Sequence, residues 1–184
     1  KYKYIPYHKL FRRTEFFHVE GYGKFEGYAN RDSLKYRSIY GLDDILTLYR
    51  GTIRRVGFSK AWNMFVQLGM TDDAYIMENS ETMSYRDFIN SFLPFHASDS
   101  VELKTRMALG IEQDDIMWDK LMELDIFNAK KIIGLKNATP AQILERILND
   151  SWTLQPEDKD MIVMYHKFGY EINGERKQID SKMV

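Results

Sequence analysis

The spacing of apolar residues changes twice along this chain of 184 residues, and each change limits the folds that it can adopt. Up to Gly57, short apolar segments rich in aromatic and β-branched residues alternate with polar residues, as β-strands do. From Phe58 to about residue 152, apolar residues recur every three to four positions, which is typical of amphipathic helices. After Asp160 the strand pattern returns. Strands, then helices, then strands predict an α+β fold with a helical unit inserted between two parts of one sheet.

These changes divide the chain into three expected segments. Residues 1–57 form the first part of a sheet domain, residues 58–152 form an inserted all-α subdomain, and residues 153–184 return to the sheet domain. Glycine, proline, serine and threonine mark the ends of the expected helices, because they suit helix caps and breaks. These helices cover residues 58–69, 84–93, 101–109, 115–124 and 139–152.

The expected strands cover residues 1–8, 16–19, 25–29, 45–55 and 161–168. The last of them is apolar with few breaks, so we expect it to be buried on both faces. The pair Asn173-Gly174 predicts a two-residue hairpin turn that leads into a partner strand at residues 175–184. His166 lies in the expected buried strand. We interpret it as a buried, hydrogen-bonded structural histidine, and a general base is the alternative.

The composition excludes several classes of protein. Apolar residues make up 44% and charged residues 29% of the chain, which is ordinary for a soluble globular protein and excludes a disordered one. The absence of cysteine excludes disulfides, thiolate metal sites and a cysteine nucleophile. No apolar run is long enough to predict a membrane span, and we expect a cytoplasmic protein. The chain opens on Lys1, so we expect a piece of a longer protein.

Charge is unevenly distributed along the chain. Residues 1–60 contain thirteen Lys and Arg against six Asp and Glu, although the whole chain has a net charge of −1. The first third therefore carries a positive field that attracts an anionic ligand. Nucleic acid is not expected as this ligand, because no nucleic-acid-binding motif is present and the isoelectric point is about 6.5.

The strand at residues 45–55 is the first candidate site for such an anion. Alternation places Arg50, Thr52 and Arg54 on one face, where two guanidiniums flank a hydroxyl and suit carboxylates or phosphates. Gly51 lies on the other face and permits close approach of another backbone. The alternative is an edge strand with solvated arginines. Arg31 is a second candidate, in the loop before a helix that Asp32 or Ser33 caps. Its alternative role is a structural salt bridge.

Three blocks of sequence resemble the glutamate-forming saccharopine dehydrogenases, also called saccharopine reductases. Residues 28–33 resemble the family's Tyr-Pro-Asn-Arg-Asp-Ser segment, and residues 50–58 resemble its Arg-Gly-Thr-Leu-Arg-x-x-Gly-Phe segment, at the family's spacing. Residues 160–169 resemble its Asp-Met-Val-Val-Leu-x-His-Lys-Phe-Gly segment. The chain departs from the family pattern at Ala29, Ile53 and Arg55.

The resemblance implies the C-terminal, substrate-binding part of an oxidoreductase that acts on a CH-NH donor in lysine metabolism. The family oxidises saccharopine to glutamate and 2-aminoadipate 6-semialdehyde with NADP or NAD. It implies a mixed β-sheet domain for substrate binding and dimerisation, interrupted by a helical subdomain. The family's Rossmann domain, which binds the nucleotide, has no counterpart in this sequence, so the chain alone is expected to be inactive.

By motif position, the resemblance implies that Arg31, Thr52, Ile53 and Arg54 contact saccharopine, with Arg50 as a further candidate. It implies a homodimer, and we expect no nucleic-acid or membrane partner. We nominate no catalytic base and no metal ligand. The acidic residues between 112 and 125 are interpreted as a solvated helical face, because no histidine lies among them. Two alternatives stay open: a related dehydrogenase of carboxylated polyamines, and a non-catalytic dimerisation module.

Overall fold

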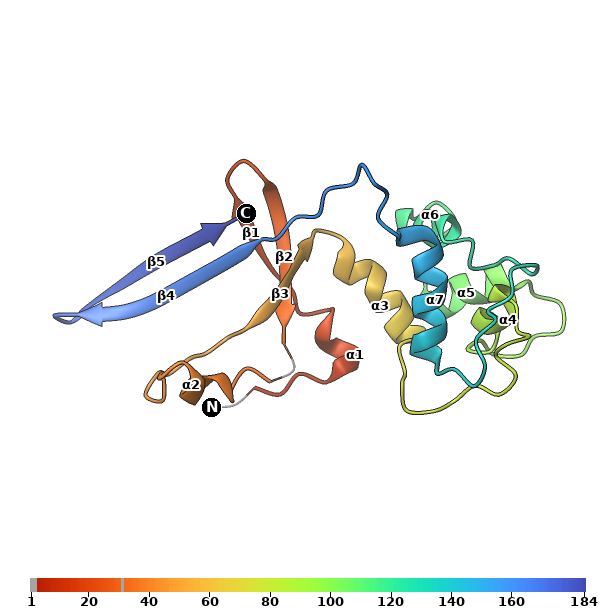
Figure 1. Ribbon diagram of the computed structural model, residues 1–184, viewed down its shortest axis with the longest axis horizontal. Helices are drawn as coiled ribbons and strands as arrows, with labels where there is room; N and C mark the ends of the chain where they lie inside the picture. The colour runs from red at the N-terminus through yellow and green to blue at the C-terminus, as the bar shows by residue number, and fades with distance from the viewer. Residues whose placement is uncertain (1–2, 31) are drawn as a thin grey trace. The chain divides into compact units, whose positions relative to one another are not determined.

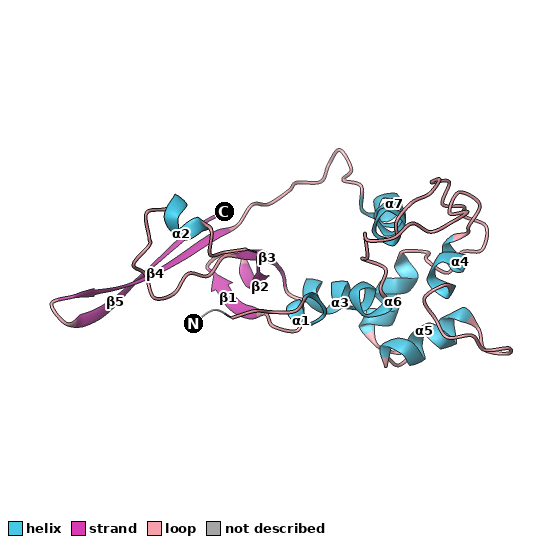
Figure 2. Ribbon diagram, turned by 90° about the horizontal axis from the view of Figure 1, so that it is seen from below, coloured by secondary structure: helices cyan, strands magenta, loops and turns pink. Residues whose placement is uncertain are grey.

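The computed structural model describes residues 3–30 and 32–184. They divide into two compact units, which are described separately. We call them the sheet unit, built mainly from Lys9–Ser59 and Gln155–Val184, and the helical unit, built mainly from Lys60–Leu154. Strands and helices are largely segregated between these units, as Figure 2 shows by colour, and the α+β class is confirmed.

The sheet unit contains a three-stranded antiparallel sheet in the order β1-β2-β3 (Figure 1). The strands are β1 (Glu15–Val19), β2 (Gly23–Ala29) and β3 (Gly51–Arg55), and the short helix α2 (Tyr36–Ile39) belongs to the same unit. The short helix α1 (Tyr7–Leu10) begins within the strand expected at residues 1–8, and its residues are divided between the two units. The predicted strands at 16–19 and 25–29 are confirmed. The third strand is shorter than predicted, because β2 ends at Ala29, opposite Gly51, and residues 45–50 have no strand to pair with.

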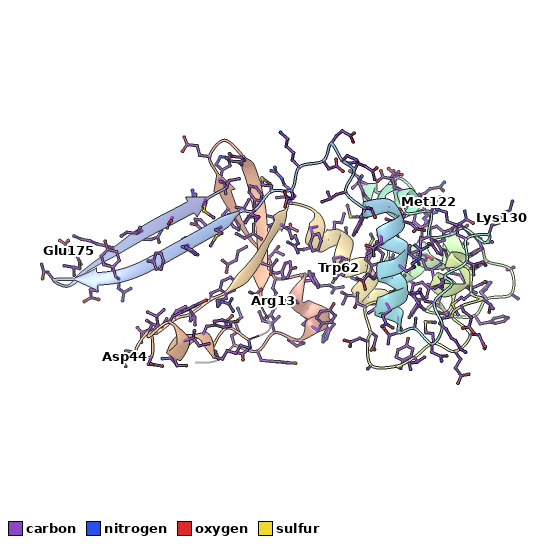
Figure 3. The ribbon with its side chains drawn as sticks, in the orientation of Figure 1. Arg13, Asp44, Trp62, Met122, Lys130 and Glu175 are labelled. Atoms are coloured by element: carbon purple, nitrogen blue, oxygen red, sulfur yellow. The ribbon has the colours of Figure 1, made fainter. Side chains whose placement is uncertain are left out.

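The last two strands form a separate antiparallel hairpin, β4 (Met164–Ile172) and β5 (Glu175–Met183). Asn173 and Gly174 have φ of 53° and 79°, so the predicted two-residue turn is confirmed. Figure 3 shows the side chains and labels Glu175 beside this turn.

Two expectations about the last strand are wrong. It is exposed along almost its whole length rather than buried on both faces, and His166 is exposed with it. The reason is that few described residues pack over the faces of the hairpin, and the stacking of Tyr165 on Phe17 is one of the few such contacts. Among the described residues the strands form two antiparallel sheets, where one mixed sheet was expected.

The helical unit is built from helices whose ends follow the capping residues in the sequence. The helices are α3 (Phe58–Leu68), α4 (Tyr85–Asn90), α5 (Val101–Leu109), α6 (Ile116–Glu123) and α7 (Pro140–Trp152). Ser84 and Thr139 form capping boxes with Asp87 and Gln142, which satisfy amide groups at the helix starts. The predicted helical segments are confirmed.

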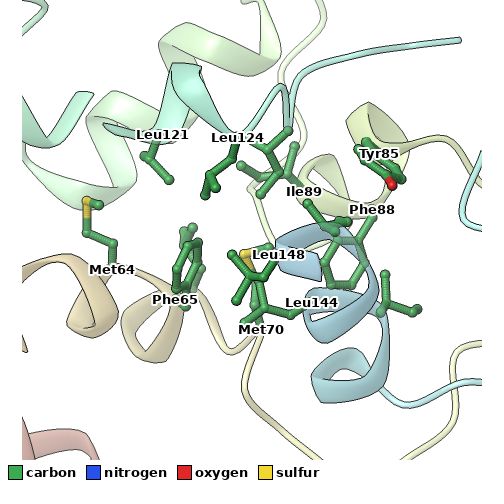
Figure 4. Packing of buried hydrophobic residues seen from close by; sticks show 14 of the residues in the cluster. Met64, Phe65, Met70, Tyr85, Phe88, Ile89, Leu121, Leu124, Leu144 and Leu148 are labelled. Atoms are coloured by element: carbon green, nitrogen blue, oxygen red, sulfur yellow. The ribbon is translucent and has the colours of Figure 1, made fainter. Parts of the chain in front are cut away.

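The core of the helical unit is formed by apolar residues of α3, α4, α6 and α7, with Val101 at the start of α5. Figure 4 shows Met64 and Phe65 of α3 directed toward the same interior as Leu121, Leu144 and Leu148. Burial of such large side chains contributes about 1.5–3 kcal/mol each, which explains why this unit is held by packing. The predicted packing role of Met64 is confirmed, since its side chain is buried, and Trp62 packs against this core.

Candidate functional site

The pairing of β2 with β3 decides which side chains share a face. Thr52 lies opposite Tyr28 and Arg54 lies opposite Glu26 in the antiparallel ladder. One further hydrogen bond, from the amide of Asn30 to the carbonyl oxygen of Arg50 (2.8 Å), continues the pairing beyond the strand end. Residues 50, 52 and 54 are thus alternate positions along one extended segment.

Arg50 and Arg54, the two arginines at these alternate positions, each rest on an aromatic ring. The guanidinium carbon of Arg50 lies 3.5 Å from the centroid of the Tyr36 ring, and that of Arg54 lies 5.1 Å from the centroid of Phe58. Neither arginine forms an ion pair with a described residue. A guanidinium held by its flat face keeps its N–H donors at its edge, where they can bind a carboxylate or phosphate oxygen.

Thr52 and Ile53 lie between these arginines in sequence. The Thr52 hydroxyl donates to the side-chain oxygen of Asn30 over 2.8 Å, which links β3 to the loop that follows β2. Ile53 is half-buried and faces Gly27 across the ladder, so its side chain is on the opposite face from Thr52. A ligand on the arginine face can therefore contact only the backbone groups of Ile53.

Arg31, the remaining predicted site residue, lies outside the described residues. In sequence it stands between Asn30 and Asp32. The carboxylate of Asp32 accepts hydrogen bonds from the amides of Leu34 (3.1 Å) and Lys35 (3.3 Å). This turn precedes the helix by several residues, so Asp32 stabilises the approach to α2 rather than its first turn.

Gly51 allows β3 to approach β2 closely at the site. A Cβ atom at this position would lie 2.7 Å from the carbonyl oxygen of Tyr28 and 3.0 Å from the ring of Tyr49. Real Cβ atoms do not approach backbone oxygen so closely. The glycine is therefore required by the packing beside Thr52.

Glu26 is a residue of this region that the sequence pattern did not single out. It is only 3% exposed, and its two carboxylate oxygens accept hydrogen bonds from the amides of Ser59 (2.6 Å) and Gly57 (3.2 Å). These amides lie at the junction of β3 and α3. In sequence, Glu26 is indistinguishable from a surface glutamate on a half-exposed strand, because its partners are more than thirty residues away.

The acidic segment at residues 112–125 has structural partners. Asp115 caps α6 through the amide of Met117, and Asp125 accepts a hydrogen bond from Asn128 and pairs with Lys131. The bond from Asn128 and the pairing with Lys131 lower the pKa of Asp125. Within the described ranges, no group of three or more His, Cys, Asp or Glu side chains is arranged to hold a metal ion. None of the helices described here has the length and apolarity to cross a bilayer.

The fold and this surface define an α+β domain with two guanidiniums and a hydroxyl at alternate positions of one extended segment. The chain belongs to the saccharopine dehydrogenase C-terminal domain family, whose model matches residues 1–184. This result confirms the resemblance found in the three sequence blocks.

Individual relatives agree with this family. The chain is 32% identical over 148 residues to mouse (Mus musculus) alpha-aminoadipic semialdehyde synthase, mitochondrial, covering 78% of this chain and 16% of that protein. It is 26% identical over 163 residues to Saccharomyces cerevisiae saccharopine dehydrogenase [NADP(+), L-glutamate-forming], covering 85% of this chain and 35% of that protein. The chain therefore spans about a third or less of these two relatives.

A solved structure supports the fold. The apo histidine-tagged saccharopine dehydrogenase (L-Glu forming) from Saccharomyces cerevisiae matches with a TM-score of 0.75 at 21% sequence identity. The match covers 95% of this chain and 40% of that one. Almost the whole chain thus has a counterpart in a domain of known architecture.

Proposed function

We propose that this chain is the substrate-binding part of a longer, NADP-dependent saccharopine dehydrogenase, which oxidises saccharopine to glutamate and 2-aminoadipate 6-semialdehyde in lysine metabolism. The observation that carries the proposal is the pair of guanidiniums, Arg50 and Arg54, that lie on aromatic rings without an acidic partner among the described residues. Family membership supplies the class of reaction, and these side chains supply a reason for this part of the enzyme to bind the substrate.

The chemistry of saccharopine suits these residues. Saccharopine carries three carboxylates, and each planar guanidinium can donate two parallel hydrogen bonds to one of them. We assign Arg54 and Arg31 as the principal carboxylate anchors and Arg50 as a further one. Thr52 contributes its hydroxyl, which releases Asn30 in order to donate to a carboxylate, and Ile53 contributes backbone groups. Fixed anchors hold the secondary amine in one orientation, which lowers the entropic cost of reaching the reactive geometry.

The nucleotide accepts the hydride in this reaction, and we assign its binding to the part of the enzyme that this chain does not cover. The names of the yeast relatives specify NADP(+), which supports NADP over NAD. We also propose a homodimer. A cytoplasmic location stays a prediction, since the names of the mammalian relatives place those proteins in mitochondria.

Calorimetric titration with saccharopine tests this function. We expect saturable binding to the wild-type chain, and a loss of about 1.5–3 kcal/mol in each of Arg31→Ala and Arg54→Ala, because each removes a charged hydrogen-bond donor. Arg176→Ala, an exposed arginine on β5, is the matched control and should bind as the wild type does. Glutamate and a carboxylated polyamine serve as comparison ligands, and tighter binding of the polyamine would favour the related dehydrogenase class.

The same titration on the full-length protein with NADP separates two reasons for a negative result. Binding that appears only there means that the nucleotide-binding part completes the site. Binding that is absent in both proteins, or that is unchanged in both arginine variants, contradicts the proposed function.

A further inference from the structure

We propose that Glu26 is a positioning residue for the Arg54 anchor. From β2 it fixes the turn between β3 and α3, and with this turn it fixes the aromatic ring on which the Arg54 guanidinium rests. This inference depends on the proposed function for its consequence in substrate binding, but the positioning itself is a property of the fold.

The hydrogen bonds of Glu26 bracket the residue beneath Arg54. One carboxylate oxygen accepts from the amide of Gly57 and the other from the amide of Ser59, at 3.2 and 2.6 Å. Phe58, whose ring lies 5.1 Å from the Arg54 guanidinium carbon, is the residue between them. Two hydrogen bonds on either side of one residue restrict its backbone, and therefore restrict the position of its ring.

Physical chemistry explains why Glu26 forms these bonds. A buried carboxylate is costly unless its charge is compensated, and Glu26 has no ion pair with a described residue. The first amides of a helix lack intrahelical acceptors and carry partial positive charge. The amides at the start of α3 therefore find acceptors in Glu26, and the buried carboxylate finds hydrogen-bond donors in these amides. Gly57 has φ of 103°, a conformation that other residues rarely adopt, so the turn also depends on a glycine.

Glu26 lies opposite Arg54 in the ladder without neutralising it. Its carboxylate is occupied by the two backbone amides, and the Arg54 guanidinium instead contacts the Phe58 ring and the carbonyl oxygen of Ile53, at 3.3 Å. The arginine charge thus stays available to an anion. An arginine that is already held loses less side-chain entropy when it binds a carboxylate.

A double-mutant cycle tests this inference, with saccharopine affinity as the measurement. Glu26→Gln keeps the size of the side chain but replaces one acceptor by an NH₂ group, so one buried amide loses its partner. We expect about tenfold weaker binding in Glu26→Gln, and less than about twofold further weakening when the same change is made in Arg54→Ala, because coupled residues are not additive. Glu20→Gln, an exposed glutamate in the adjacent turn, is the matched control.

The alternative outcomes are distinct. Unchanged affinity in Glu26→Gln, or an equal loss in the wild-type and Arg54→Ala backgrounds, overturns the positioning role, since a merely structural Glu26 would not act through Arg54. If Glu26→Gln does not fold, Phe58→Leu replaces it in the cycle, with the same coupling expected. Additive losses there would contradict the proposal.

A second measurement, by NMR, needs no ligand. It therefore tests the positioning role of Glu26 independently of whether the proposed function is correct. The Phe58 ring should shift the NMR resonances of the Arg54 side-chain protons, and Glu26→Gln should return them toward the values of a solvated arginine. Unshifted resonances in the wild type, or identical resonances in wild type and variant, overturn the inference whether or not saccharopine binds.

Discussion

Gly51 is the residue at which the sheet leaves no room for a side chain. In Gly51→Ala, the new methyl group would clash with the carbonyl oxygen of Tyr28, so β3 must move away from β2 beside Thr52. We expect a loss of roughly 1–3 kcal/mol in local stability, which is typical of overpacking. Faster amide hydrogen exchange in β2 and β3 is the measurement that checks it.

Gly169→Ala is the control for this substitution. Gly169 also lies within a strand, but a Cβ atom there would meet nothing within 4 Å, and the residue does not have a positive φ. We expect it to leave exchange in β2 and β3 unchanged. If Gly51→Ala accelerates exchange in β2 and β3 no more than Gly169→Ala does, the clash at Gly51 does not limit the stability of this sheet.

At the scale of the element, the β4–β5 hairpin is specified by its turn and by its alternation. One face carries Met164 and Phe168 opposite Met183 and Ile179, and the other carries mainly polar and charged side chains. The turn has positive φ at both central residues, which matches the twist of the strands.

Gly174→Ala should weaken this hairpin. The φ of 79° at this position is strained for a residue with a Cβ atom, so we expect a cost on the order of 1 kcal/mol. Amide exchange should accelerate across β4 and β5, while exchange in the helical unit stays the same. Protection that is unchanged in the hairpin would mean that contacts other than the turn hold it.

At the scale of the whole molecule, the helical unit should respond to acid through its paired carboxylates. Asp150 accepts a hydrogen bond from Tyr85 (2.5 Å) and pairs with Arg146, and both contacts lower its pKa below the ordinary 3.8. Pairing with Arg86 lowers the pKa of Glu102 below the ordinary 4.5. Burial and the bond to Asp150 raise the pKa of Tyr85 to about 12, so it stays a donor at neutral pH.

The sign of the pH dependence follows from these directions. A lowered carboxylate pKa stabilises the folded state above the ordinary values, and this stability is lost as the pH falls toward the folded-state values. Asp150→Asn should therefore cost about 1 kcal/mol at pH 7 and progressively less below pH 4.

Tryptophan fluorescence during denaturant unfolding measures this effect, because all three tryptophans lie within the helical unit. Asp73→Asn removes an exposed carboxylate from a loop of the same unit and should have little effect at either pH. A destabilisation by Asp150→Asn that does not shrink in acid would contradict the role of its charge.

The sequence by itself determined the elements that depend on neighbouring residues. Caps such as Ser84 and Thr139, the Asn173-Gly174 turn and the change of apolar period all act within a few positions, so the helices and the hairpin were predictable. The three motif blocks likewise identified the family and nominated Arg54 and its neighbours.

Only the tertiary structure decided what depends on distant contacts. The length of β3 depends on where β2 ends, and the exposure of His166 depends on how little of the described chain packs over its face of the hairpin. The Tyr36 ring beneath Arg50 and the bonds of Glu26 to the start of α3 join segments that are separated in sequence. The spacing of residues in the sequence does not identify such partners, because tertiary packing brings them together.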